Sequence, residues 1–255
     1  IASSIMSKKI AEGAGALVLD VKVGSGAFMK DLDAARELAR TMVALGADAG
    51  VAVRALLTDM STPLGLTAGN ALEVAESLEV LAGGGPADVV DLTVALALEM
   101  CAAAGRPVEE DQARAALADG RAMDIWRDMI SRQGGDPDAP LPLAPETETV
   151  TAPADGVLTT LDALAVGVAA WRLGAGRARK EDPVQAVAGV TMHAKPGDEV
   201  RAGQPLLTLH TATPERFTRA REALAGGIVI SQAGSPQAAD AVARRERGVI
   251  LERIG

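Results

Sequence analysis

The sequence of 255 residues predicts an α/β fold, and three observations support that prediction. Strand-like and helix-like patterns alternate from about Ala16 to Gln133, as the layers of an α/β domain require. A segment rich in Pro and Gly, residues 134–145, then interrupts the alternation. After it, short β runs surround one Ala-rich helix over Asp162–Arg172, which is an α+β pattern. We therefore expect an α/β domain over 15–133, a linker over 134–146 and an α+β domain over 147–255.

The first element is a helix from Ile1 to about residue 12, and one stripe of it has an unusual composition. Ile1, Ser4, Ile5 and Lys8 recur at helical spacing and lie along that stripe. Two apolar side chains beside a hydroxyl and an ammonium suit a flat heterocycle with apolar faces and a polar edge. A solvated helix face with a snorkelling lysine explains the same spacing. Four of the six lysines fall in the first thirty residues, which favours a chemical role.

The next element is an apolar run over Ala16–Val23, which predicts a buried strand that ends in the glycine-rich turn Gly24–Gly26. In open α/β sheets, ligands collect outside the carboxyl ends of strands. Asp20, Lys22 and the turn are therefore placed for a site. Glycines in this turn are equally consistent with a positive φ or with close packing.

Further along the α/β region, the pattern predicts a strand over Val51–Leu57, a turn at Pro63–Gly65 and a helix over Ala68–Leu81. The apolar run Val94–Ala104 contains Cys101, the only cysteine, so an internal disulfide is impossible. We expect Cys101 to be a buried thiol on a helix.

Composition and charge restrict the class of protein. Hydrophobic residues make up 48% of the chain, enough for sizeable cores, and the net charge of -9 argues against a nucleic-acid partner. The run Val94–Ala104 is too short to span a bilayer, and no signal peptide is visible. The two histidines, His193 and His210, lack the spacing of a metal site. We expect a soluble cytoplasmic protein without a membrane partner.

Long, ordered segments of the chain resemble one family. ASSIMSKKIAEGAGALVLDVKVGSGAFMK, followed by LLTDMSTPLGLTAGNALEVAESLEVL, closely resembles the thymidine and pyrimidine-nucleoside phosphorylases. The similarity continues through ADGVL, ALAVGVAAWRLGAGRAR and KPGDEVRAGQPLLTLH, so it covers essentially the whole chain. The resemblance implies a homodimeric pentosyltransferase without an organic cofactor. It also implies that residues 1–14 are one helix of a small α domain and that the α/β domain has a mixed sheet.

The activity that the resemblance implies is reversible phosphorolysis of thymidine, uridine or both. Inorganic phosphate attacks the anomeric carbon, giving the free base and (2-deoxy)ribose 1-phosphate. Ser4 and Lys8 match residues that bind the carbonyl and N3 edge of the pyrimidine. Lys8 is expected to be catalytic, because a fixed ammonium stabilises the charge that the base acquires as it leaves. Ile1, Ile5 and Phe28 match apolar positions of the base pocket, for which ordinary core packing is the alternative.

The resemblance also implies a site for a monovalent cation. Leu64 and Thr67 match positions that supply backbone carbonyls, and Glu76 matches one that supplies a carboxylate. Thr67 stands where the family commonly has alanine. Oxygen-only ligation suits a hard cation such as potassium. The alternative for Glu76 is a solvated helix residue in a row of acidic side chains.

Some features remain open at this stage. The family's phosphate-binding loop and an arginine that binds the base would lie before Ile1, so we expect the chain to be the later part of a longer protein. One alternative is a phosphoribosyltransferase related to anthranilate phosphoribosyltransferase. A second is a carrier or interaction module, because the C-terminal region resembles the sandwich hairpins of biotinyl and lipoyl domains, with Lys195 as the modified residue. Pro-Gly after Lys195 and the interrupting helix favour the phosphorylase. The sequence leaves the choice between thymidine and uridine open, as it does the roles of Asp20, Lys22 and Asp59.

Overall fold

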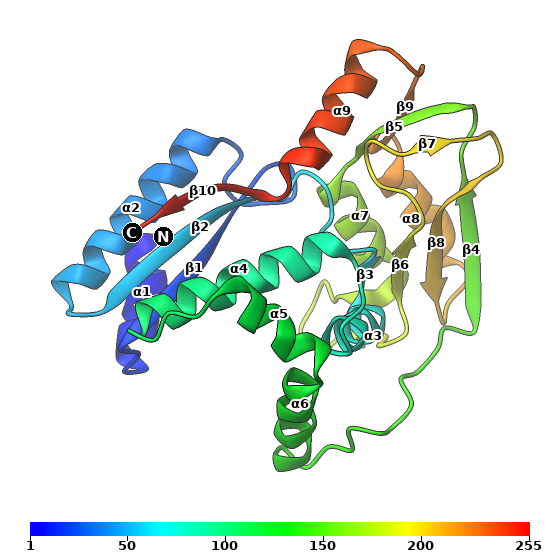
Figure 1. The fold of residues 1–255 in the computed structure, drawn as a ribbon. Helices are drawn as coiled ribbons and strands as arrows, with labels where there is room; N and C mark the ends of the chain where they lie inside the picture. Colours follow the sequence, from blue (N-terminus) through cyan, green and yellow to red (C-terminus); the bar gives the residue numbers. More distant parts are fainter.

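The computed structural model describes residues 1–255, and a mixed three-stranded sheet organises its first part (Figure 1). Strands β1 (Ala16–Val23) and β2 (Ala52–Asp59) are parallel, with Ala16 opposite Ala52. Strand β10 (Ile250–Ile254) lies antiparallel on the other side of β2, so the order is β1-β2-β10. The mixed sheet that the resemblance implies is present.

Helices cover both faces of this sheet. Helix α2 (Leu32–Asp48) connects β1 to β2 and begins at Asp31, whose carboxylate accepts a hydrogen bond from the Ala34 N–H at 2.9 Å. It packs with α1 (Ala2–Ala11) on one face, and Figure 1 shows α4 (Ala87–Ala103) across the other. The core between α1, α2 and the sheet, which we call the first core, contains Met6, Val21, Val23, Ala35, Ala39, Met42, Val53, Ala55 and Leu57.

The expected alternation of strands and helices holds only as far as β2. A two-residue strand, β3 (Thr67–Ala68), and four helices follow it. Cys101 lies on α4 as expected, but it is half-buried rather than buried. Each of these later segments has helical periodicity and no strand pattern, so local sequence favours consecutive helices. Besides α4, the helices are α3 (Asn70–Leu81), α5 (Glu110–Ala118) and α6 (Arg121–Arg132).

A second group of elements, which we call the C-terminal body, consists of two sheets with α7 (Ala163–Ala170) and α8 (Arg216–Leu224). Its strand orders are β3-β6-β8-β4 and β7-β5-β9, so β3 joins it from the first part of the chain. A core of 18 buried residues fills its interior. The strands not yet given are β4 (Glu146–Thr151), β5 (Gly156–Leu161), β6 (Gly189–Met192), β7 (Glu199–Val200), β8 (Pro205–Thr211) and β9 (Ile228–Ser231).

The chain then returns to the first sheet. Helix α9 (Pro236–Arg247) packs against β5 of the C-terminal body, and β10, which follows it, pairs with β2. Arg36 of α2 forms an ion pair with Glu252 of β10 at 2.8 Å. None of the helices combines the length and the apolar character that crossing a membrane needs.

Candidate functional site

Helix α1 places the predicted pyrimidine-binding pair on its outer surface. Met6 is buried in the first core, which fixes the rotation of the helix. Ser4 and Lys8 are consequently exposed, one turn apart. The neighbouring Lys9 forms an ion pair with Glu12 at 3.1 Å, whereas Lys8 forms none. The Lys8 ammonium is therefore accessible to a ligand.

The three apolar residues predicted for the base pocket line a single cavity of about 530 Å³. Phe28 is 78% exposed and Ile1 is 61% exposed, so ordinary core packing does not account for these two side chains. Ile5 is half-buried and packs against the first core. The other apolar residues that line the cavity are Leu19, Val21, Ala27, Met29, Leu38, Met42 and Met60.

Asp20 and Lys22 border the same cavity, and the structure shows what holds them. One carboxylate oxygen of Asp20 accepts from the Lys22 ammonium at 2.5 Å, and the other accepts from the buried hydroxyl of Thr58. Lys22 and Thr58 are direct partners across the β1–β2 pair. The three side chains thus form a polar link between the two parallel strands.

The glycine turn after β1 is required by close packing. Gly24 has φ +125°, and a Cβ atom on it would overlap Ser61. A Cβ atom on Gly26 would overlap the Met60 carbonyl and the Ala163 side chain. The turn brings the end of β1 against the segment after β2 and the start of α7, which is the close-packing interpretation.

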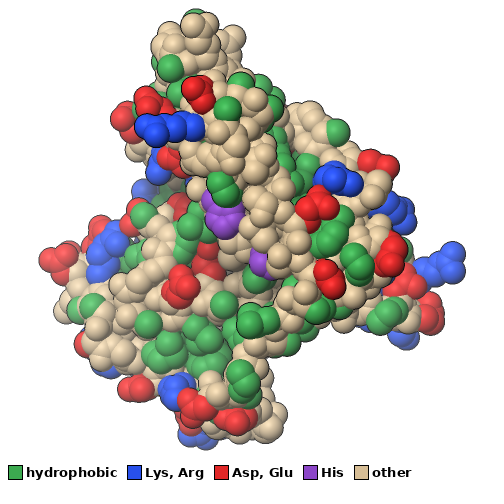
Figure 2. Space-filling view, turned by 90° about the vertical axis from the view of Figure 1, so that its right-hand side faces the viewer, with side chains coloured by type: hydrophobic (Ala, Val, Ile, Leu, Met, Phe, Trp, Pro, Cys, Tyr) green, Lys and Arg blue, Asp and Glu red, His purple; other side chains and the backbone are tan.

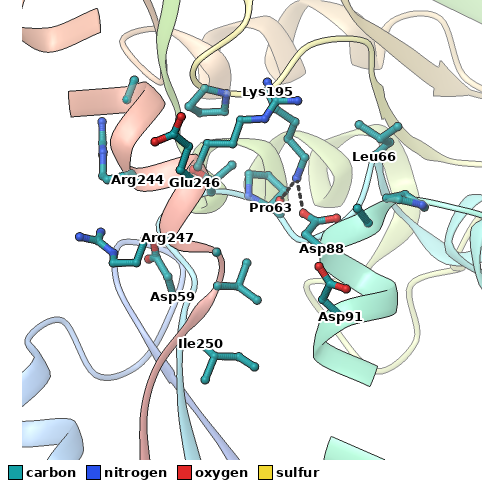
Figure 3. Close-up of a pocket in the computed structure, with 18 residues that line it drawn as sticks. Asp59, Pro63, Leu66, Asp88, Asp91, Lys195, Arg244, Glu246, Arg247 and Ile250 are labelled. Atoms are coloured by element: carbon teal, nitrogen blue, oxygen red, sulfur yellow. Dashed lines mark hydrogen bonds and ion pairs between the residues drawn. The ribbon is translucent and has the colours of Figure 1, made fainter. Parts of the chain in front are cut away.

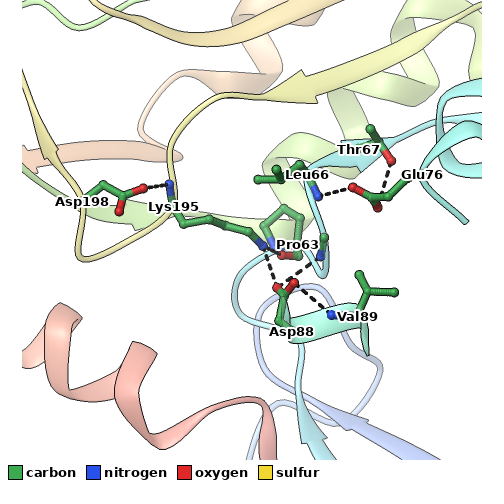
Figure 4. Close-up of polar contacts among 9 residues, drawn as sticks. Pro63, Leu66, Thr67, Glu76, Asp88, Val89, Lys195 and Asp198 are labelled. Carbon is green, nitrogen blue, oxygen red and sulfur yellow. Dashed lines mark hydrogen bonds and ion pairs between the residues drawn. The ribbon is translucent and has the colours of Figure 1, made fainter. Parts of the chain in front are cut away.

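The predicted cation ligands lie on the loop after β2 and on α3. Glu76 of α3 accepts hydrogen bonds from the Leu66 N–H at 2.6 Å and from the Thr67 hydroxyl at 3.1 Å (Figure 4). Burial raises the pKa of Glu76, and the two hydrogen bonds counteract part of that rise. The Glu76 carboxylate therefore binds the loop after β2. The alternative, in which Glu76 is a solvated residue in a row of acidic side chains, is wrong.

The backbone around Glu76 is compatible with a hard cation. Gly65 has φ +67°, and a Cβ atom on it would overlap the Glu76 carboxylate, so only glycine allows this approach. The Met192 N–H donates to the Leu66 carbonyl at 2.7 Å, so Thr67 takes the non-hydrogen-bonded position of the β3–β6 pair and its carbonyl points away from β6. No donor of the chain bonds the Leu64 carbonyl. Two carbonyls and one carboxylate are oxygen ligands of the kind that potassium takes.

Lys195 lies in a different setting from the modified lysine of a carrier. Its side chain is 16% exposed, and its ammonium is 3.0 Å from the Asp88 carboxylate and donates to the Pro63 carbonyl (Figure 4). A carrier displays its lysine at a hairpin tip, so this buried and paired group contradicts the carrier hypothesis. The sequence does not predict a role for Asp88, because its partner Lys195 lies 107 residues away.

A larger cavity, of about 610 Å³, lies at the carboxyl end of β2 between α4, α9 and the loop that carries Lys195 (Figure 3). Basic side chains of α9 line one side and Asp88 and Asp91 line another. Most of these charges are already paired, as Asp91 is with Arg114 at 2.7 Å. Asp59 also borders the cavity, and its carboxylate accepts from the Ser61 N–H at 2.8 Å, which gives it a role in the local turn.

The two histidines lie on one face of the molecule (Figure 2). His210 and Thr191 are 3.0 Å apart, and His193 and Thr208 are 2.7 Å apart. Burial, reinforced by the charge of His193, lowers the pKa of His210. Both partners are hydroxyls of neighbouring strands, which agrees with a structural role, and no cluster of three His, Cys, Asp or Glu that could hold a metal is present.

Comparison with known proteins gives two family matches. Residues 2–123 match the model of the glycosyl transferase family, a/b domain, and residues 157–231 match that of the pyrimidine nucleoside phosphorylase C-terminal domain. Thymidine phosphorylase of Mycobacterium tuberculosis is 62% identical over 227 residues, 89% of this chain and 53% of that protein. Pyrimidine-nucleoside phosphorylase of Bacillus subtilis is 46% identical over 219 residues, 82% of this chain and 51% of that protein. The corresponding protein of Staphylococcus epidermidis is 45% identical over 224 residues, 84% of this chain and 52% of that protein.

The fold and the matched segments define the class: a glycosyltransferase-type α/β layer joined to a C-terminal domain of the phosphorylase type. The chain spans about half the length of the curated relatives it matches. It belongs to the family of thymidine and pyrimidine-nucleoside phosphorylases.

Proposed function

We propose that this chain carries the pyrimidine-binding part of an enzyme for the reversible phosphorolysis of pyrimidine nucleosides. The observation that carries the proposal is the placement of Ser4 and Lys8 on the exposed face of α1, whose Ile1 and Ile5 border an apolar cavity with Phe28. Relatives named thymidine phosphorylase and pyrimidine-nucleoside phosphorylase support it.

The chemistry assigns each group a task. An oxygen of inorganic phosphate forms a bond to the anomeric carbon, the bond from that carbon to N1 breaks, and its electron pair remains on the base. The negative charge spreads onto the ring carbonyl oxygens, where Lys8 stabilises it more in the transition state than in the ground state. Ser4 orients the ring edge, since a hydroxyl both donates and accepts. Ile1, Ile5 and Phe28 contact the apolar ring faces.

The cation site belongs to the same proposal. Leu64 and Thr67 would supply carbonyls and Glu76 its carboxylate to potassium, which would neutralise charge next to a half-buried acid. We also propose a cytoplasmic homodimer without an organic cofactor, and a barrel-sandwich arrangement for the hairpins of the C-terminal body. Support for that arrangement comes from the two short sheets that enclose one apolar core.

The test is release of thymine from thymidine and of uracil from uridine by the protein expressed from its complete gene. Release that requires inorganic phosphate, proceeds without magnesium and yields the pentose 1-phosphate supports the proposal and ranks the two nucleosides. Dependence on magnesium and a diphosphate substrate would instead favour the phosphoribosyltransferase alternative. No phosphate-dependent release from either nucleoside contradicts the proposed function.

A further inference from the structure

Lys195 belongs to the loop between β6 and β7 of the C-terminal body, yet its ammonium lies against other segments. It is 3.0 Å from the carboxylate of Asp88, in the first turn of α4, and it donates to the carbonyl of Pro63, in the loop after β2. One ammonium thus joins three segments that are far apart in the sequence. Two acceptors bond the Lys195 ammonium, and the side chain is only 16% exposed. These contacts hold the Lys195 side chain in one position.

The loop of residues 63–67 is bound by charged side chains at consecutive positions. The same oxygen of Asp88 that accepts from Lys195 also accepts from the Gly65 N–H at 3.2 Å. The next N–H along the chain, that of Leu66, donates to Glu76 at 2.6 Å. Three charged side chains, from α3, from α4 and from the loop between β6 and β7, therefore set the path of five residues. Two of those residues carry the carbonyls of the proposed cation site.

The loop between β6 and β7 is itself anchored, so it can act as a fixed support. The Lys195 N–H donates to the carboxylate of Asp198 at 2.8 Å, and Arg245 of α9 forms an ion pair with the same carboxylate. The turn that carries Lys195 is consequently braced by α9, which packs against β5.

We propose that Lys195 is a positioning residue whose ammonium, a cation built into the chain, holds the loop of residues 63–67 in the geometry of the proposed cation site. The cation half of this inference rests on the proposed function. Through Lys195, the C-terminal body would determine how the loop presents its carbonyls.

The first test is amide hydrogen exchange in the protein from the complete gene. Lys195→Met removes the charge and keeps the length, Lys195→Arg keeps the charge, and Lys180→Met is the control at an exposed lysine of the same body. In Lys195→Met, the amides of Gly65 and Leu66 should exchange roughly tenfold faster or more, while that of Leu57 in β2 stays unchanged. Unchanged exchange at Gly65 and Leu66 would overturn the inference, as would equal acceleration at Leu57, which would indicate general unfolding.

The second test measures how the thermal unfolding midpoint responds to potassium chloride, with choline chloride keeping the ionic strength constant. Lys195→Met should need roughly threefold more potassium or higher for half of the response, because its loop must be ordered at binding, and Lys195→Arg should recover part of the difference. Identical potassium dependence in wild type and Lys195→Met would overturn the role of Lys195 alone. A wild-type protein that does not distinguish the two salts would overturn the cation site, while the base-release assay decides the proposed activity separately.

Discussion

At the scale of single residues, the lysines near the start of the chain differ in whether they form an ion pair within the protein. Lys9 and Lys22 are engaged by Glu12 and Asp20, whereas Lys8 projects from α1 without an ion pair. The sequence places four lysines near one another without distinguishing them. Their partners distinguish them, and they support Lys8 as the residue that contacts the leaving base.

We predict that Lys8→Met lowers kcat by roughly a hundredfold to a thousandfold, because one preorganised donor at the developing charge has an effect of that size. The KM for phosphate should change little, since Lys8 is assigned to the base. Steady-state kinetics of thymine release by the complete protein measure both constants. Lys9→Met is the matched control and should retain near wild-type activity. Equal losses in turnover and in phosphate affinity would contradict the assignment of Lys8.

His210 predicts a pH dependence of stability. Its pKa in the folded protein lies below the ordinary value of 6.5 because of burial, so below pH 6.5 the unfolded chain takes up a proton that the folded protein resists. The contribution of His210 to stability is complete above pH 6.5 and is lost as the pH falls through its lowered pKa. Urea unfolding at pH 5.5 and 7.5 should show a smaller decrease on acidification for His210→Gln than for wild type. Equal decreases would exclude this role.

At the scale of elements, local sequence signals fix most boundaries. The apolar run Ala16–Val23 becomes β1 with the same bounds, and the helix expected over Ala68–Leu81 becomes α3, which begins two residues later because Thr67 and Ala68 pair with β6. Helix α7 begins at Asp162, whose carboxylate accepts from the Ala165 N–H at 2.8 Å. These signals are local, so reading the sequence recovers them.

Removing this cap should destabilise the C-terminal body. Asp162→Ala should lower the free energy of unfolding by about 1 kcal/mol, because the Ala165 N–H loses its acceptor at a helix start. Asp162→Asn, which keeps an acceptor, should retain most of the stability. Urea denaturation followed by the fluorescence of the two tryptophans measures both variants. Equal losses in the two variants would show that the cap is not the cause.

At the scale of the whole molecule, the last strand returns to the sheet formed by the first two. Leu251 and Ile254 of β10 pack against the first core, and Glu252 forms an ion pair with Arg36 of α2. The segment expected as the C-terminal domain, 147–255, therefore contributes one strand to the sheet of the α/β layer. The pairing of β10 with β2 and that of β3 with β6 tie the two parts of the molecule together.

Truncation after Gly248 tests this connection. Loss of β10 should lower the free energy of unfolding by about 2–4 kcal/mol, because the buried contacts of Leu251 and Ile254 are lost and the edge of β2 becomes exposed. Amide exchange should accelerate in β1 and β2 more than in β8, which lies in the other core. Glu252→Gln, which removes only the ion pair, should cost at most about 1 kcal/mol. Unchanged exchange in β1 and β2 after truncation would contradict the proposed support.

The candidate site also depends partly on local sequence patterns and partly on contacts between distant segments. Spacing on one helix placed Ile1, Ser4, Ile5 and Lys8 on a stripe, and family resemblance added Phe28. The cavity that Ile1, Ile5 and Phe28 share with Met42 and Met60 depends on how α1 and α2 pack on the sheet. No periodicity in the sequence encodes that packing, since it joins segments that approach only after the chain folds.

The sequence by itself determined the α/β class, the bounds of β1, the start of α7 and the family, because these depend on residues close together in the chain and on long matching segments. The tertiary structure alone decided that Lys195 meets Asp88, that Glu76 binds the loop after β2, and that β10 joins β2. Each of these contacts joins two segments, and the hydrophobic periodicity of neither segment predicts that they meet. Which charged groups become paired, and which remain available for a substrate, is therefore settled by long-range packing.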